Sequence, residues 1–191
     1  YQQGSQFGGG SNLLSFSPDA SEIMTSNGVN IVWRNSDTGV AIEDPLVARG
    51  TMPDWSPDGG RLVYANPGVL PPCFGGFCGA PGVEQGQLEI VEYDGALWGE
   101  PSVLVPYAGQ NNYYPTFSPD GEWVLFNRSP GNANSFDAPD AQVWAVTAET
   151  GEPMQLAAAS TGGDSWPKWA PDVQDYRGHT LMWFTFSSRR A

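Results

Sequence analysis

The chain consists of short runs in which apolar and polar positions alternate, each bounded by Gly, Pro, Asp or Asn. The run QVWAVT (142–147) is an example, and its period of two is typical of a half-buried β-strand. No segment keeps the 3.6-residue period of an amphipathic helix over a useful length. The pattern therefore predicts an all-β protein made of many short strands.

A recurring motif precedes four of these runs: an aromatic residue, a small residue, then Pro-Asp. Pro presets φ at the first turn position, Asp can accept a hydrogen bond from the backbone ahead of it, and a following Gly supplies a positive φ. The motif thus predicts a tight hairpin. The copies read LLSFSPDASEIMTSN (13–27), MPDWSPDGGRLVYAN (52–66), YPTFSPDGEWVLFNR (114–128) and WPKWAPDV (166–173), the last resuming after an insertion as TLMWFTFSSRR (180–190).

A second pair of strands follows each of the first three hairpins, over 29–42, 87–105 and 142–157. Four strands per repeat, at about 40 residues, are typical of a β-propeller blade. The sequence therefore predicts four-stranded antiparallel blades. Their ranges are about 13–47, 52–105 and 114–157, with an incomplete blade over 166–191 and a flexible linker or leading loop over 1–12.

The motif resembles the PD40 (WD40-like) repeat of the TolB-like propellers, and the likeness runs from about Ser11 to Arg190. The chain departs from it at Ala20, which replaces the turn Gly, at Val173, and in the insertion QDYRGH (174–179). Only about three and a half blades are present, out of a ring expected to hold about six to eight. We expect a segment of a longer polypeptide; the alternative is a ring completed by a second copy. The resemblance implies protein–protein contact as the usual role, and export to the periplasm or the cell exterior.

Two insertions lengthen the same loop of successive blades, the one between the second and third strands, over 67–86 and 129–141. In an up-and-down blade this loop lies on the same face as the loop that leads to the next blade, opposite the Pro-Asp turns. Loops held by a rigid scaffold are where binding residues concentrate. For the aromatic residues at 113, 114 and 166 the alternative is packing between blades. The candidate partner-binding or ligand-binding residues of this face are Asn111, Asn112, Tyr113, Tyr114, Asp164, Trp166, Phe74 and Phe77.

Charge narrows the classes of partner. The net charge is −13, and Lys168 is the only lysine. Such a surface repels nucleic acid and anionic lipid, because little on it could neutralise phosphates. No stretch approaches the roughly 20 apolar residues of a membrane-spanning helix, so we expect no direct membrane insertion.

Two small features carry possible chemistry. Cys73 and Cys78 could close a small disulfide loop, which would fit an oxidising compartment; two free thiols are the alternative. Asp137 and Asp140 lie close together in a loop and are the candidate ligands of a Ca²⁺ ion. We expect no other cofactor.

Catalytic motifs are missing from the sequence. There is no G-x-S-x-G nucleophile elbow, and the single histidine, His179, lies in the inserted hairpin, where a solvated loop residue is expected. The sequence therefore favours a non-enzymatic scaffold or binding module. One alternative is the substrate-gating propeller of a prolyl-oligopeptidase-like serine hydrolase whose catalytic domain lies outside this chain. Another is carbohydrate or small-ligand binding on the loop-rich face, with Tyr113, Tyr114 and Trp166 as stacking platforms.

Overall fold

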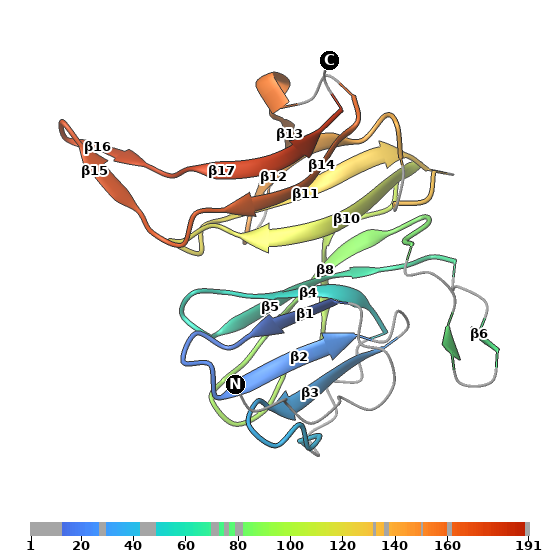
Figure 1. Cartoon of the computed structure of the whole chain (residues 1–191), viewed down its shortest axis with the longest axis vertical. Coiled ribbons are helices and arrows are strands. Elements are labelled where there is room, and N and C mark those ends of the chain that lie inside the picture. The colour runs from blue at the N-terminus through green and yellow to red at the C-terminus, as the bar shows by residue number, and fades with distance from the viewer. Residues whose placement is uncertain are drawn as a thin grey trace.

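A computed structural model describes residues 13–26, 30–42, 49–69, 73–74, 77–78, 82–131, 133–135, 138–149, 151–159 and 162–189. Within them the strands form six sheets: four larger units and two separate two-stranded hairpins, β6 Cys73–Phe74 with β7 Phe77–Cys78 and β15 Gln174–Tyr176 with β16 His179–Leu181. The four larger units follow one another up the molecule in chain order, as Figure 1 shows from blue to red. We number these four units blades 1 to 4. The predicted all-β architecture of antiparallel propeller blades is confirmed.

Blade 1 contains three strands in the order β1-β2-β3. Where a fourth strand is predicted, Ala41 forms a single antiparallel bridge with Arg34, and Ile42 N donates to Trp33 O at 2.9 Å. Residues 43–47 of the predicted blade lie outside the described residues. The strands are β1 Leu13–Phe16, β2 Glu22–Ser26 and β3 Ile31–Asn35.

Blades 2 and 3 are complete four-stranded sheets, with each strand paired antiparallel to the next. Blade 2 consists of β4 Thr51–Trp55, β5 Arg61–Asn66, β8 Gln87–Glu92 and β9 Ser102–Val105. Blade 3 consists of β10 Gln110–Phe117, β11 Trp123–Pro130, β12 Gln142–Thr147 and β13 Met154–Gln155, followed by the 3₁₀ turn η1 Ala157–Ala159.

Blade 4 pairs β14 Asp164–Trp169 with β17 Phe184–Ser188. The insertion between them forms its own hairpin, β15 Gln174–Tyr176 and β16 His179–Leu181, which projects from the body in Figure 1. Ala170 N donates to Trp183 O at 2.7 Å, the counterpart of the bond from Ser17 N to Glu22 O in blade 1. The second strand therefore resumes near Trp183 rather than at residue 180 as predicted, because 180–181 pair within the inserted hairpin.

The two ends of the strands differ in character. One end carries the insertion with β6 Cys73–Phe74 and β7 Phe77–Cys78, and the loops around 106–110, 133–135 and 138–141; we call it the insertion rim. The opposite end carries the Pro-Asp turns and the projecting hairpin; we call it the Pro-Asp face. In Figure 1 these two ends lie on the right and on the left.

The Pro-Asp turns form as the sequence predicts. The Oδ1 atom of Asp19 accepts hydrogen bonds from the Ser17 hydroxyl at 2.7 Å and from Ser21 N at 3.0 Å. Asp58 and Asp120 repeat both bonds in blades 2 and 3. Since the serine is also the residue whose backbone closes the hairpin, each turn is fixed by side chain and main chain together.

Neighbouring blades are joined by apolar clusters and by hydrogen bonds. The motif aromatics Trp55 and Phe117 are 7% and 5% exposed, but Phe16 in blade 1, at the end of the described stack, is 51% exposed. The residue before each aromatic bonds to the next blade: Ser15 Oγ accepts from Trp55 N at 3.1 Å, and Asp54 Oδ2 accepts from Phe117 N at 2.8 Å. Because both bonds cross from one sheet to the next, they fix the spacing of the blades.

Candidate binding surfaces

The innermost strands of the blades share an irregularity. In β4, β10 and β14 the register shifts near Met52, Tyr114 and Trp166, which have φ values of 57°, 51° and 59°. Positive φ is uncommon outside glycine, and a β-bulge redirects a side chain out of the regular pleat. Each of these residues also precedes a proline. The three strands therefore present their bulge residues in the same way.

The redirected side chains line one concave surface, which we call the inner wall. Tyr114 and Trp166 have ring centroids 5.1 Å apart, and Trp166 is 57% exposed. Tyr113 is fully buried, with its ring 5.3 Å from that of Tyr114. Only Tyr114 and Trp166 of the predicted aromatic platform thus reach this surface. A cavity of about 120 Å³ here is lined by Leu13, Leu14, Met52, Pro53, Asp54, Tyr114, Pro115, Thr116, Trp166, Pro167 and Lys168.

A polar layer crosses the inner wall. Lys168 Nζ lies 2.9 Å from Asp54 Oδ1 and 3.3 Å from Thr116 Oγ1. These three residues hold the same position in successive blades, one residue after the proline. Because the Lys168 side chain is 66% exposed, the ion pair adds little stability and leaves the ammonium accessible.

The predicted polar residues of the insertion rim are buried rather than displayed. Asn111 is fully buried: its Nδ2 donates to Val83 O at 2.7 Å and Ala133 O at 2.8 Å, and its Oδ1 accepts from Gly86 N at 2.8 Å. One side chain therefore joins the two insertions to blade 3. This role could have been anticipated only from knowing that both insertions fold back over the same strand.

Asn112 and Asp164 are also fully buried. Asn112 Nδ2 contacts three carbonyl oxygens, among them Gly86 O at 3.1 Å, and its Oδ1 accepts from Arg128 Nε at 2.9 Å. Asp164 N donates to Ala141 O, and Asp164 O accepts from Asn127 Nδ2 at 2.9 Å. These bonds connect Asn112 and Asp164 to neighbouring loops and strands, so the two residues shape the rim from inside.

Burial also changes the ionisation of groups at the rim. Desolvation raises the pKa of the Tyr113 hydroxyl to about 12, and it raises the pKa of Tyr114 as well. Burial lowers the pKa of the Arg128 guanidinium, whose Cζ lies 4.3 Å from the Trp144 ring centroid. In all three groups the largest cause of the shift is desolvation, which follows from the burial of this part of blade 3.

Several other predicted residues are placed only in part. Cys73 pairs with Cys78, and Phe74 with Phe77, as register partners of β6 and β7; their side chains lie outside the described part of the structure. Asp137 also lies outside it, and Asp140 is exposed in a turn. In the described ranges no group of three or more His, Cys, Asp or Glu side chains could hold a metal ion. The disulfide and the Ca²⁺ site therefore remain predictions.

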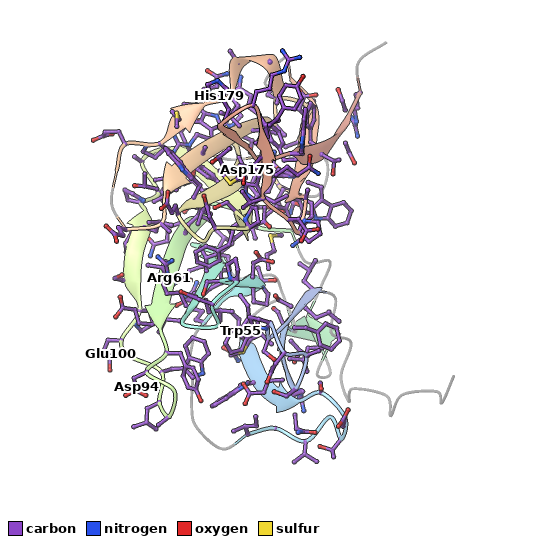
Figure 2. The ribbon with its side chains drawn as sticks, turned by 90° about the vertical axis from the view of Figure 1, so that its left-hand side faces the viewer. Trp55, Arg61, Asp94, Glu100, Asp175 and His179 are labelled. Carbon is purple, nitrogen blue, oxygen red and sulfur yellow. The ribbon has the colours of Figure 1, made fainter. Side chains whose placement is uncertain are left out.

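The Pro-Asp face, opposite the lengthened loops, carries open grooves and the projecting hairpin. His179 lies on this hairpin and is exposed, as Figure 2, which looks onto this face, shows together with Asp175. Tyr176 and Trp183 are 55% and 57% exposed, and Arg177 lies over Tyr176 with Cζ 5.0 Å from the ring centroid. Loop length does not predict the grooves between blades. Whether a groove is open or filled depends on a single residue at the start of the second strand of each blade.

Comparison with known proteins shows similarity in structure but none in sequence. No protein-family model matches the chain, and no curated protein matches it. The part of the chain described here contains no helix of the length and apolarity needed to cross a membrane.

Solved structures similar to this chain include propellers and propeller-containing peptidases. TolB from Acinetobacter baumannii is 14% identical with a TM-score of 0.53, and the match covers 91% of this chain and 40% of that one. A Mycobacterium tuberculosis puromycin-hydrolysing peptidase is 16% identical with a TM-score of 0.50, covering 78% of this chain and 22% of that one. The chain thus spans less than half of each of these two structures. Identity this low shows the fold alone: the described residues have the fold of a TolB-like β-propeller.

Proposed function

We propose that this chain is a non-catalytic propeller module that binds a segment of a partner protein on its inner wall, within an exported or cell-envelope assembly. The observation that carries the proposal is the composition of that wall. Trp166 and Leu14 are 57% and 47% exposed there, beside three prolines and the aromatic ring of Tyr114. Exposed aromatic and apolar side chains grouped on a concave surface favour contact with another protein.

Site-specific photo-crosslinking in the full-length protein tests this proposal. We expect p-benzoylphenylalanine in place of Trp166 to give one discrete adduct with another polypeptide in the native host. The same residue in place of Val103, which is 53% exposed on β9, the outermost strand of blade 2, is the matched control and should not give that adduct. An identical adduct pattern at both positions, or none at 166, would contradict the inner wall as the binding surface.

A gating domain of a serine hydrolase is the second candidate, because the fold likeness includes a peptidase. This function would place the nucleophile on a part of the protein beyond this chain. A fluorophosphonate probe, which labels activated serines, separates the two. Labelling of the full-length polypeptide would favour the gating domain, whereas the binding module should stay unlabelled.

Carbohydrate binding on the same wall would rest on Tyr114 and Trp166 as stacking rings, since Tyr113 is buried. Trp166→Ala in the folded protein should then abolish retention on a glycan array while leaving the protein adduct at other wall positions intact. Loss of the protein adduct alone would support the binding module instead.

Export is supported by the pairing of the two cysteines. Directly paired residues of an antiparallel ladder have Cα atoms about 4.5–5.5 Å apart, within the range that a disulfide requires. We propose that Cys73 and Cys78 form a disulfide in the native protein. Treatment with an alkylating reagent alone should leave the intact mass unchanged, whereas the same treatment with reductant present should raise it. A rise in mass without reductant would show free thiols instead.

A further inference from the structure

A groove of about 340 Å³ lies on the Pro-Asp face between blades 1 and 2. It is distinct from the inner wall, with which it shares no lining residue. Figure 2 looks onto this face and labels Trp55, one of the residues that line the groove, and Arg61 of blade 2. The groove is lined by Ser17, Pro18, Asp19, Ser21, Glu22, Trp55, Asp58, Gly59 and Tyr93.

One side of the groove is aromatic. Trp55 is 7% exposed, and its Nε1 has no hydrogen-bond partner among the described residues. Its ring centroid lies 5.0 Å from that of Trp98, and Tyr93 stacks on Trp98 at 4.8 Å. These contacts hold the rings of Trp55 and Tyr93 in fixed positions, as a cation–π site requires.

The other side of the groove is acidic. Glu22 is held in place by Trp33, whose Nε1 donates to Glu22 Oε2 at 2.9 Å. Hydrogen bonds from Ser17 and Ser56 lower the pKa values of Asp19 and Asp58, so both carboxylates are charged at neutral pH. None of the described residues that line the groove is basic. A cationic side chain would therefore be attracted here without displacing an internal partner.

The next groove, between blades 2 and 3, shows how such a cation would sit. There Arg61 places its Cζ 5.5 Å from the centroid of the Phe117 ring, and its Nη2 donates to Gly121 O at 2.8 Å. This internal guanidinium thus uses the face of the motif aromatic and the carbonyl of the turn glycine of the following blade.

The two grooves are equivalent by sequence and by geometry. Gly59 and Gly121 have φ values of 75° and 74°, and a Cβ on each would lie 3.6 Å from the proline of the preceding blade, Pro18 or Pro57. Trp55 corresponds to Phe117. The residue equivalent to Arg61 in blade 1 is Glu22, because each accepts through its backbone oxygen the hydrogen bond that closes its turn. The first groove thus has the equivalent aromatic ring and glycine carbonyl. At the position of Arg61, however, it has the carboxylate of Glu22 instead of a guanidinium.

We propose that the groove between blades 1 and 2 binds the guanidinium of an arginine in a basic segment of a partner protein. The guanidinium lies over Trp55, donates to Gly59 O as Arg61 donates to Gly121 O, and is neutralised by Glu22. Gly59 O accepts no hydrogen bond from the described residues, so it is available for this contact. This is a second binding surface, separate from the inner wall.

Binding can be measured on the full chain with the peptide acetyl-Gly-Arg-Gly-amide, by following the indole N–H resonance of Trp55. The resonance is assigned by its loss in Trp55→Phe. We expect a saturable shift with this peptide and none with the uncharged isostere acetyl-Gly-citrulline-Gly-amide. An equal response to both peptides would overturn the proposal, because it would show that the positive charge is not recognised.

Variants of the groove test the role of Glu22. Glu22→Gln should weaken binding of the arginine peptide by about tenfold, since a hydrogen bond to a charged group is worth about 1.4 kcal/mol or more in this setting. Glu122→Gln, which changes a carboxylate lining the neighbouring groove, is the matched control and should bind as the wild type does. Unchanged binding in Glu22→Gln would refute the site.

Two further variants keep the outcome unambiguous. Glu22→Arg should fill the groove as Arg61 fills the next one, and it should abolish binding while the protein stays folded. Trp166→Ala, on the inner wall, should leave binding of the arginine peptide unchanged. Loss of peptide binding in Trp166→Ala would contradict the independence of the two surfaces, whereas loss of the wall adduct alone would concern only the proposed function.

Discussion

The insertion rim and the Pro-Asp face use polar side chains in opposite ways. At the rim Asn111 and Asn112 are fully buried, and their side chains bond to backbone groups of the surrounding loops. On the Pro-Asp face the carboxylates of Asp19, Glu22 and Asp58 surround an open groove. The rim has the longer loops, yet the open polar surface lies at the other end.

The difference shows that loop length and binding are separable in this fold. A long insertion must satisfy its own backbone groups, and here buried asparagine side chains do so. The Pro-Asp turns are short, so one residue per blade, at the start of the second strand, determines how the space between blades is filled. These residues are Glu22, Arg61, Trp123 and Trp183. Exchange of that residue decides whether a groove is filled or open.

The largest expected effect is at the rim. Asn111→Ala removes one side chain that satisfies three buried backbone groups, so we expect the free energy of unfolding to fall by about 3 kcal/mol or more. Urea denaturation measures it. Gln110→Ala, the exposed neighbour, is the control and should change the free energy by less than about 0.5 kcal/mol. Equal effects for the two would mean that Asn111 does not join the insertions to blade 3.

The filled groove between blades 2 and 3 should show a smaller effect. Arg61→Ala removes the contact with Phe117 and the bond to Gly121 O, so we expect a loss of about 1–2 kcal/mol in thermal or chemical unfolding. The control is Arg177→Ala, which removes a guanidinium over Tyr176 on the exposed hairpin and should cost less than about 0.5 kcal/mol. If Arg61→Ala is as mild as the control, Arg61 does not stabilise the groove, and the analogy with Glu22 fails.

The fold could be read from the sequence because its motif is local. Aromatic, serine, proline and aspartate stand close together, and the same few hydrogen bonds form in each of the first three turns. The positions of the two insertions on one rim followed from strand order alone. The exposed Trp166 and the half-buried Tyr114 also lie on a surface, although that surface is the inner wall.

The candidate site could be predicted only in part, because burial depends on contacts distant in sequence. Asn111 bonds to Val83 and Ala133, and nothing in the residues around 111 indicates either partner. The open groove could have been anticipated from the sequence, because an alignment of the repeats places Glu22 at the position equivalent to Arg61. The sequence does not indicate, however, that this position faces the motif aromatic of the next blade. The structure shows that it does.

Glycine at position 20, as in the second and third Pro-Asp turns, should stabilise the first turn. Ala20 has a φ of 60°, whereas Gly59 and Gly121 hold the equivalent positions at 75° and 74°. Left-handed backbone costs a non-glycine residue about 1–2 kcal/mol, and glycine's unfolded-state entropy offsets part of that. We expect Ala20→Gly to stabilise the protein by about 0.5 kcal/mol in chemical denaturation. Gly59→Ala should destabilise it by a similar amount, and the same sign for both changes would contradict the assignment.

The smallest expected effect concerns the pH dependence of the second turn. The Ser56 hydroxyl, and then Gly60 N, donate to the Asp58 carboxylate and lower its pKa below the ordinary value of 3.8. The folded state therefore holds this proton less readily than the unfolded chain, so the contribution is present above about pH 4 and is lost as pH falls through the folded pKa. The exposed position limits it to less than about 0.5 kcal/mol.

Asp58→Asn tests this contribution. The stability difference between wild type and Asp58→Asn, measured by urea denaturation, should be larger at about pH 6 than at about pH 3. Ser56→Ala removes the largest cause of the shift, so the Asp58 carboxyl, followed by NMR, should titrate nearer its ordinary value. An unchanged pKa of Asp58 in Ser56→Ala would show that the serine does not lower it, and that the lowered pKa has another cause than the motif.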